Sequence, residues 1–350
     1  MKKIIRIIAT CSIVLAFITS NLTAATQYTI TDLGTLGGNE SSAWGINESG
    51  QVVGQSYLTG YSSAHAFLYD GSTMKDLGTL GGDISWAHGI NDSGQVAGQS
   101  RNGSSDMCAF LYDGTVMKDI GGLGGGLPIA WSINNSGQVV GSSGHAFLYD
   151  GTVMKDLGTL GGNNSGANGI NDSGQITGYS YIAGNSVKHA FLYDSTTMKD
   201  LGTLGGNSSG AWALNNNGQV IGYSDITGNS TYHAFLYDGT IMKDIGTLSG
   251  SSFAYGINEN NQVVGQSYIE GDSVFHAFLY ENNNMVDLNT LLPTGSGWLL
   301  NNATAINDSG QIAGYGTIDG KRHAFLMTPV PEPATILLLT LGGLVFRKRK

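Results

Sequence analysis

Cysteine is scarce in this sequence, and its scarcity limits how the chain can be stabilised. Two cysteines occur among 350 residues, and Cys11 lies in an apolar run near the N-terminus. Once that run is removed, Cys108 has no partner, so the sequence excludes an internal disulfide. The body of the chain must then be held together by its hydrophobic core, for which roughly 300 residues are ample.

Basic residues are also few. The chain has 16 Lys and Arg against 26 Asp and Glu, which gives a net charge of −10. Seven of the basic residues and one acidic residue lie in segments 1–24 and 330–350, so the net charge of the region between them is −16. Because an acidic surface repels a phosphate backbone, we expect no nucleic-acid partner.

Signals for helices and for catalysis are missing as well. No repeated segment has a sustained 3.6-residue apolar period, which argues against helical repeats. HExxH and phosphate-loop motifs do not occur. The acids outside the repeats are scattered over predicted loops, whereas glycoside hydrolysis requires two carboxylates at a defined separation. We therefore predict a protein without catalytic residues, cofactor or metal ion.

Abundant glycine, by contrast, recurs in phase with a repeat. The segment HAFLYDGTVMKDLGTLGG, residues 145–162, returns with small changes seven times. The Asp that opens its second half recurs at spacings of 37 to 44 residues, at Asp32, Asp76, Asp119, Asp156, Asp200, Asp244 and Asp287. A GIN segment, a polar turn and GQVVG make a third marker. Self-similarity at this period is typical of repeat architectures and propellers.

Each repeat contains signals for four short strands. In the first copy these are residues 43–47, 51–56, 65–69 and 73–80, and Asp70-Gly71 is a strong hairpin signal. A turn glycine recurs, as in Gly50, and only Asn261 replaces it, which indicates a left-handed backbone position. Another glycine lies in every second strand, as in Gly54, where we expect a neighbouring backbone or ring to pack. Four strands per copy predict the blade of a β-propeller.

The ends of the repeat region predict how the ring closes. The chain enters at residues 27–33 on a fourth strand and leaves at residues 322–327 on a third strand. The N-terminal strand can therefore complete the last blade and remove the exposed sheet edge. The predicted fold is all-β: a seven-bladed propeller spanning 25–329.

Both termini carry export signals. Lys2, Lys3 and Arg6 precede an apolar run, and Ala24 offers a cleavage site, so residues 1–24 are predicted to be a signal peptide. At the other end, residues 334–346 are apolar and precede a basic cluster. This run is about 20 Å long as a helix, shorter than a usual membrane span. A permanent membrane anchor remains the alternative to a sorting signal.

The C-terminal segment resembles a PEP-CTERM sorting signal. The match comprises the triplet Pro331, Glu332 and Pro333, the Gly342-Gly343 pair and the basic end of segment 330–350. The resemblance implies recognition by an exosortase in a Gram-negative bacterium that makes exopolysaccharide, after transient inner-membrane insertion through 334–346. The mature protein would be secreted or held at the cell surface.

The repeats resemble the HAF-repeat family of exported bacterial proteins. The HAFLYDG and DLGTLGG segments carry this resemblance over residues 27–328, with Cys108 in place of His in the second copy. The resemblance implies no established activity for the repeats. The repeated His and Asp, as in His145 and Asp156, are expected to share structural hydrogen bonds, because equivalent His residues lie too far apart to share a metal ion.

The NDSGQ turns leave a calcium alternative open. Asp92, Asp172 and Asp308 supply one carboxylate per turn, whereas a calcium loop needs several oxygen ligands close together. We expect hairpin turns at these positions, with weak calcium binding as the other interpretation.

One position of the first strand varies between copies although its neighbours barely change. It is expected to line the central channel near the crossover loops, and it holds Trp44, His88, Trp131, Asn168, Trp212, Tyr255 and Thr304. Aromatic rings mixed with polar groups suit stacking against sugars, so the first six are candidate ligand-binding residues. Alternatively, the tryptophans fill gaps between blades.

These observations predict a non-catalytic exported protein that binds exopolysaccharide or another matrix component. Two alternatives stay open: an extracellular lyase or glycosidase, because a propeller can host either enzyme, and a protein–protein scaffold that uses the same loops.

Overall fold

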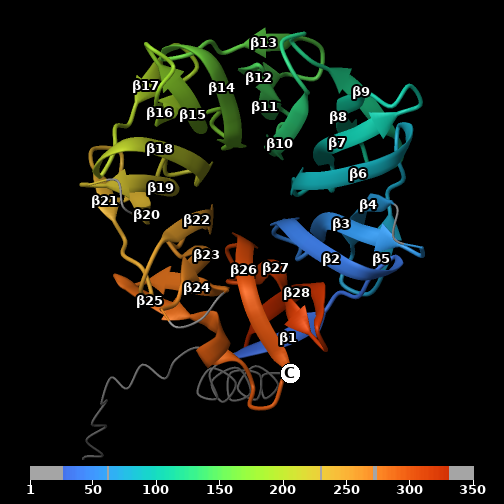
Figure 1. Cartoon of the computed structure of the whole chain (residues 1–350). Helices are drawn as coiled ribbons and strands as arrows, with labels where there is room; N and C mark the ends of the chain where they lie inside the picture. Colours follow the sequence, from blue (N-terminus) through green and yellow to red (C-terminus); the bar gives the residue numbers. More distant parts are fainter. Residues whose placement is uncertain (1–26, 61–62, 229–230, 271–273, 331–350) are drawn as a thin grey trace, which may run out of the picture.

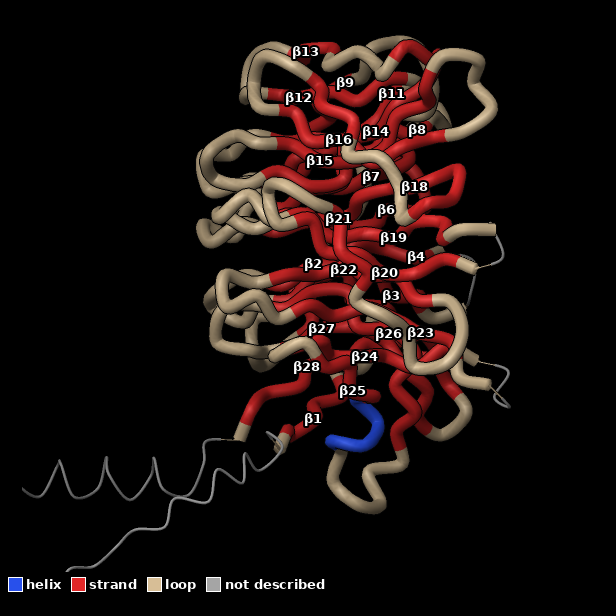
Figure 2. Tube along the Cα trace, turned by 90° about the vertical axis from the view of Figure 1, so that its left-hand side faces the viewer, coloured by secondary structure: helices blue, strands red, loops and turns tan. Residues whose placement is uncertain are grey.

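The protein is a ring of seven sheets around a central axis (Figure 1). The structure, a computed structural model, describes residues 27–60, 63–228, 231–270 and 274–330. Each sheet has four antiparallel strands, and the order within a sheet follows the chain in six of them. Seen from the side, the strands lie in layers across the disk while loops and turns gather on its two faces (Figure 2).

The blades follow one another along the sequence, and their strands have the following bounds. Blade 1 contains β2 (Gly37–Ile46), β3 (Val52–Leu58), β4 (Ala64–Tyr69) and β5 (Met74–Asp76). Blade 2 contains β6 (Gly81–Ile90), β7 (Val96–Asn102), β8 (Met107–Tyr112) and β9 (Met117–Gly121). Blade 3 contains β10 (Ile129–Ile133), β11 (Val139–Ser143), β12 (His145–Tyr149) and β13 (Met154–Asp156).

The second half of the ring continues the pattern. Blade 4 contains β14 (Gly161–Ile170), β15 (Ile176–Ile182), β16 (Lys188–Tyr193) and β17 (Met198–Asp200). Blade 5 contains β18 (Gly205–Leu214), β19 (Val220–Ile226), β20 (Tyr232–Tyr237) and β21 (Met242–Asp244). Blade 6 contains β22 (Ser252–Ile257), β23 (Val263–Tyr268), β24 (Phe275–Glu281) and β25 (Asn284–Asp287), and the 3₁₀ turn η1 (Leu288–Leu291) follows.

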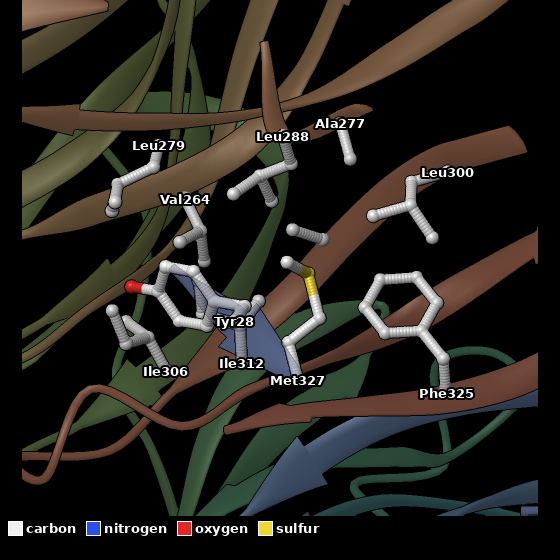
Figure 3. Packing of buried hydrophobic residues seen from close by; sticks show 11 residues of the cluster. Tyr28, Val264, Ala277, Leu279, Leu288, Leu300, Ile306, Ile312, Phe325 and Met327 are labelled. Carbon is white, nitrogen blue, oxygen red and sulfur yellow. The ribbon is translucent and has the colours of Figure 1, made fainter. Parts of the chain in front are cut away.

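The last blade joins the two ends of the propeller. It contains β26 (Trp298–Ile306), β27 (Ile312–Ile318), β28 (Lys321–Pro329) and, as its outermost strand, β1 (Tyr28–Asp32). Strand β1 pairs with β28 from Tyr28 opposite Pro329 to Asp32 opposite Phe325. Tyr28 is buried among residues of blades 6 and 7 and of η1 (Figure 3). The predicted seven-bladed fold and its closure by the N-terminal strand are therefore confirmed.

The core lies between neighbouring blades and is built from the repeated residues. The phenylalanine of each HAF segment is completely buried, at Phe67, Phe110, Phe147, Phe191, Phe235, Phe278 and Phe325. The glycine of each second strand makes room for it: a Cβ on Gly54 would lie 2.9 Å from the Phe67 ring and 2.0 Å from the Ser42 carbonyl oxygen. This confirms the expected close packing at these glycines.

The fourth strand is shorter, and the first strand longer, than the sequence predicts. Residues 73–80 were expected as one strand, but β5 ends at Asp76. There the Asp76 carboxylate accepts a hydrogen bond of 2.7 Å from the Gly78 backbone N–H, and Gly78 has φ +73°. A positive φ ends an extended strand. The stretch between Asp76 and Gly81 is thus a crossover, and β6 begins at Gly81, within the DLGTLGG segment.

Candidate functional site in the central channel

A β-bulge near the end of each first strand positions the variable residue. In blade 1 the register shifts between Ala43 and Gly45, so Trp44 has no partner on β3. The same shift occurs in all seven blades. A bulge redirects the extra side chain away from the regular alternation of the strand. We call the seven bulge residues the channel ring: Trp44, His88, Trp131, Asn168, Trp212, Tyr255 and Thr304.

The structure brings the whole channel ring together around one cavity. The cavity has a volume of about 510 Å³, and all seven residues line it, as do Gln266, Asn302 and Tyr315. The expected location near the crossover loops is wrong. Trp44 is the eighth of ten residues in β2 and so lies closer to the turn that follows. The reason is that β2 begins six residues earlier than predicted.

Aromatic members of the ring touch one another in sequence around the channel. The ring centroids are 5.7 Å apart for Trp44 and His88, and 4.5 Å apart for His88 and Trp131. Trp131 reaches Trp212 at 6.2 Å, and Trp212 reaches Tyr255 at 5.7 Å. Most of these pairs are edge-to-face, the arrangement that aromatic quadrupoles favour. The result is a continuous aromatic arc from blade 1 to blade 6.

Two polar members of the ring bind the backbone of the next blade. The Asn168 amide donates to the Ala211 carbonyl at 2.7 Å, and the Thr304 hydroxyl donates to the Ala43 carbonyl at 3.1 Å. These side chains therefore stabilise contacts between blades as well as lining the cavity.

The Tyr255 hydroxyl accepts a hydrogen bond from Gln266 at 3.1 Å, and burial raises the pKa of Tyr255.

His88 differs from these polar residues. Both of its ring nitrogens are buried and have no hydrogen-bond partner among the described residues. Burial lowers the pKa of His88 to about 3, so the imidazole is neutral at physiological pH. The side-chain oxygen of Asn302 is buried without a partner as well, while its amide donates to the Tyr315 hydroxyl at 3.2 Å.

A closed ring of asparagines lies just beyond the cavity. Each Asn of the GIN segments donates its amide to the backbone carbonyl of the equivalent Asn in the next blade. The distances are 3.0 to 3.2 Å. We call this set the asparagine ring: Asn47, Asn91, Asn134, Asn171, Asn215, Asn258 and Asn307. It joins blade 7 to blade 1 in the same way as every other pair of neighbours.

A second closed ring, which we call the mouth ring, surrounds that end of the channel. It consists of Glu48, Asp92, Asn135, Asp172, Asn216, Glu259 and Asp308. Each member's backbone N–H donates to the side-chain oxygen of the next member. Burial, together with the negative charges of Asp308, Asp92 and Glu259, raises the pKa of Glu48. The predicted hairpin turns are confirmed, because Gly50 has φ +76° and Asn261 has φ +62°.

The repeated His and Asp form pairs within the blades, as expected. The Nδ1 atom of His145 lies 2.9 Å from Asp156, and equivalent pairs of 2.7 to 2.9 Å occur in the other blades that carry His. The same Asp156 also accepts the Gly158 backbone N–H at 2.8 Å, so each pair fixes the start of a crossover. Within the described ranges, no group of three or more His, Cys, Asp or Glu could hold a metal ion.

Gln266, Asn302 and Tyr315 are among the cavity residues that sequence reasoning missed. Gln266 and Tyr315 occupy equivalent places in β23 and β27, where other copies carry Gln55, Ser142 or Tyr179. Variation at this place between copies was the available signal. Whether this position borders the cavity depends on which strands pair with each other. In the last blade, Asn302 lies opposite Tyr315 in the sheet.

The C-terminus matches a known sorting motif. Residues 329–350 match the PEP-CTERM protein-sorting motif, which includes Pro331, Glu332 and Pro333. The motif implies an exported protein of the surface or extracellular space of a Gram-negative bacterium, processed by exosortase-type sorting machinery. The predicted signal peptide and the segment 334–346 lie outside the described residues. Among the residues that the structure describes, no helix is long and apolar enough to cross a membrane.

Similarity to known proteins is otherwise distant. No curated protein matches the chain. A putative TolB from Agrobacterium tumefaciens is 13% identical, covering 88% of this chain and 100% of that chain, with a TM-score of 0.45. A Trypanosoma rangeli sialidase in complex with 2,3-difluorosialic acid is 9% identical, covering 86% of this chain and 58% of that chain, with a TM-score of 0.39.

A third similar structure is a mutant of AofleA from Arthrobotrys oligospora. It is 12% identical, covers 75% of this chain and 90% of that chain, and has a TM-score of 0.35. All three identities are low, so nothing about activity is transferred from these proteins to this chain.

Proposed function

We propose that this exported protein is a non-catalytic, glycan-binding component of the cell surface or extracellular matrix, and that the central cavity is its binding site. The observation that carries the proposal is the aromatic arc of the channel ring. Five aromatic or imidazole side chains from five blades border one cavity beside hydrogen-bonding groups. Such a combination suits the apolar faces and the hydroxyl edges of a sugar ring.

The exposure of the ring residues supports binding over simple gap filling. Trp44 is 36% exposed although it lies in the channel, and it is not part of a hydrophobic core cluster. Trp131 and Trp212 are half-buried and also lie outside those clusters. A tryptophan that only filled space between blades would pack into the core instead. The sorting motif agrees with this proposal, because it implies export to the cell surface or the extracellular space.

The chemistry of the cavity supports a binding role without catalysis. None of the described side chains that line it is a carboxylate, whereas hydrolysis of glycosides commonly uses two. The nearest ring of carboxylates is the mouth ring, where the acids accept backbone hydrogen bonds from neighbouring blades. Those bonds give the acids a structural role.

Co-sedimentation with polysaccharide tests the proposal. The full-length chain, kept in mild detergent, is mixed with exopolysaccharide from the producing organism and centrifuged. The double variant Trp131→Ala, Trp212→Ala removes the middle of the arc. Two lost stacking contacts of about 1 kcal/mol each should weaken binding by roughly 30-fold.

Trp86→Ala is the matched control, because Trp86 lies in a first strand but does not line the cavity. Saturable binding that the double variant loses and Trp86→Ala retains would support the proposal. A folded wild-type chain that does not bind the polysaccharide would refute it and would favour a protein partner. Turnover of the polysaccharide that depends on one or two acids would instead indicate an enzyme.

A further inference from the structure

One member of the channel ring, His88, lacks the protein hydrogen bonds that its polar counterparts make. Asn168, Thr304 and His88 occupy the same bulge position, and the first two donate to carbonyl groups of the next blade. Both His88 nitrogens are buried without a partner in the described part of the chain. A neutral imidazole carries one N–H donor and one acceptor, and leaving such groups buried and unpaired is destabilising.

The neighbours of His88 show how a ligand could reach it. Its ring lies between Trp44, at a centroid distance of 5.7 Å, and Trp131, at 4.5 Å. Trp44 has the largest exposed fraction of the channel ring, 36%. A ligand in the cavity would have to displace the Trp44 or Trp131 side chain to reach the buried imidazole nitrogens. Asn302, whose side-chain oxygen is also buried without a partner in the described chain, lines the same cavity.

We propose that His88 and Asn302 are the hydrogen-bonding groups with which the cavity selects an uncharged, hydroxyl-rich ligand, that is, a neutral sugar residue. This inference rests on the proposed glycan-binding function and adds the ligand class to it. A sugar hydroxyl both donates and accepts, so it matches the imidazole donor, the imidazole acceptor and the Asn302 oxygen. Pairing of these groups on binding replaces an unfavourable apo state with satisfied hydrogen bonds.

The charges around the cavity argue against an acidic sugar. The described lining residues include no Lys, Arg, Asp or Glu, so a uronate carboxylate would find no counter-charge there. His88 supplies no positive charge, since its pKa of about 3 keeps it neutral. The mouth ring places five carboxylates at the adjoining end of the channel. A buried, unpaired carboxylate is costly, so neutral sugars are favoured.

The variant His88→Phe separates this proposal from a structural role. It keeps an aromatic ring between Trp44 and Trp131 and removes both unpaired nitrogens. Stability and binding should change in opposite directions: the melting temperature should rise by about 2 °C, while affinity for a neutral oligosaccharide should fall about 3- to 10-fold. Asn168→Leu is the matched control at the same bulge position. It removes a paired side chain, so its melting temperature should fall.

Binding is measured for the full-length chain on an immobilised panel. The panel holds gluco-, manno-, galacto- and xylo-pentasaccharides beside pentamers of galacturonate and mannuronate. Binding to a neutral pentamer, with weaker binding and a higher melting temperature in His88→Phe, supports the inference. Equal or stronger binding to the uronates, or unchanged affinity in His88→Phe, overturns it while glycan binding itself stands. No binding to any pentamer refutes the proposed function. A lower melting temperature in His88→Phe shows that the His88 nitrogens are already hydrogen-bonded in the free protein and so overturns the inference.

Discussion

The asparagine ring should be a major source of stability, and Asn171→Ala tests this directly. Asn171 is 5% exposed. Its amide donates to Asn215 of the next blade at 3.0 Å and to the Gln175 side chain at 2.8 Å. Its oxygen accepts the Gln175 backbone N–H at 2.9 Å and the Ser173 hydroxyl at 2.8 Å. Alanine would remove all four bonds, three within the turn and one between blades.

The magnitude follows from that count. A typical intramolecular hydrogen bond contributes about 1 kcal/mol net, so the loss of four bonds should lower the free energy of unfolding by about 4 kcal/mol. Urea unfolding followed by tryptophan fluorescence measures this change, with the slope of the transition compared between variants. An unchanged slope with a lower midpoint indicates lost stability without a new intermediate.

Asn163→Ala is the control, because Asn163 is an exposed residue near the start of β14, the strand that leads to Asn171. An exposed substitution of this kind should change the unfolding free energy by less than about 0.5 kcal/mol. If Asn171→Ala were no more destabilising than Asn163→Ala, the ring of inter-blade hydrogen bonds would not stabilise the propeller.

Three further predictions concern the blades themselves. His145→Ala should lower the melting temperature by only about 1 °C and leave glycan affinity unchanged, because the His145–Asp156 pair is more than a third exposed. Cys108→His should raise the melting temperature by about 1–2 °C in calorimetry, since it restores opposite Asp119 the pair seen in the other blades. Hydrogen bonds from Thr73 and Ser72 lower the pKa of Asp70 from 3.8 to about 2. Because this folded-state pKa is depressed, the stability it contributes is present above about pH 4 and is lost as the pH falls toward about 2. Asp70→Asn should therefore flatten that part of the stability profile in thermal melts against pH; an unchanged slope would contradict this.

Much of the fold could be predicted from the sequence because its seven repeats carry the same turn, strand and glycine signals. The turn glycine and its single replacement, Asn261, indicated a left-handed position that the structure has at φ +62°. The incomplete first and last copies predicted the pairing of β1 with β28. The residues at which the strands begin and end were harder to predict. A segment such as 73–80 has strand-forming residues at its start, but the strand ends where the Gly78 backbone N–H donates a hydrogen bond to the Asp76 carboxylate.

The candidate site could be predicted in part, and the limit has a physical cause. Variation between copies identified the six candidate ligand-binding residues, and the structure places them around one cavity. The bulge that directs them was not predictable, because the repeat of Ala43 and Gly45 beside Trp44 is compatible with a regular strand. Asn302 and Tyr315 belong to the cavity through strand pairing across a sheet, and local sequence does not specify such contacts.

Two positions at the end of the first strand have different roles: one holds the blades together and the other lines the cavity. This difference explains how the repeats can be nearly identical while the channel is asymmetric. The asparagine ring needs the same residue in every blade, because each amide must reach the next carbonyl. The bulge residue three positions earlier has no partner in the register of the second strand, so side chains as different as Trp44 and Thr304 fit there without altering the blade. Exchange of residues at this position can therefore change what the cavity binds while the closed rings that hold the propeller stay intact. For that reason we expect substitutions of the tryptophans in the channel ring to affect binding more than folding, and substitutions in the asparagine ring to do the reverse.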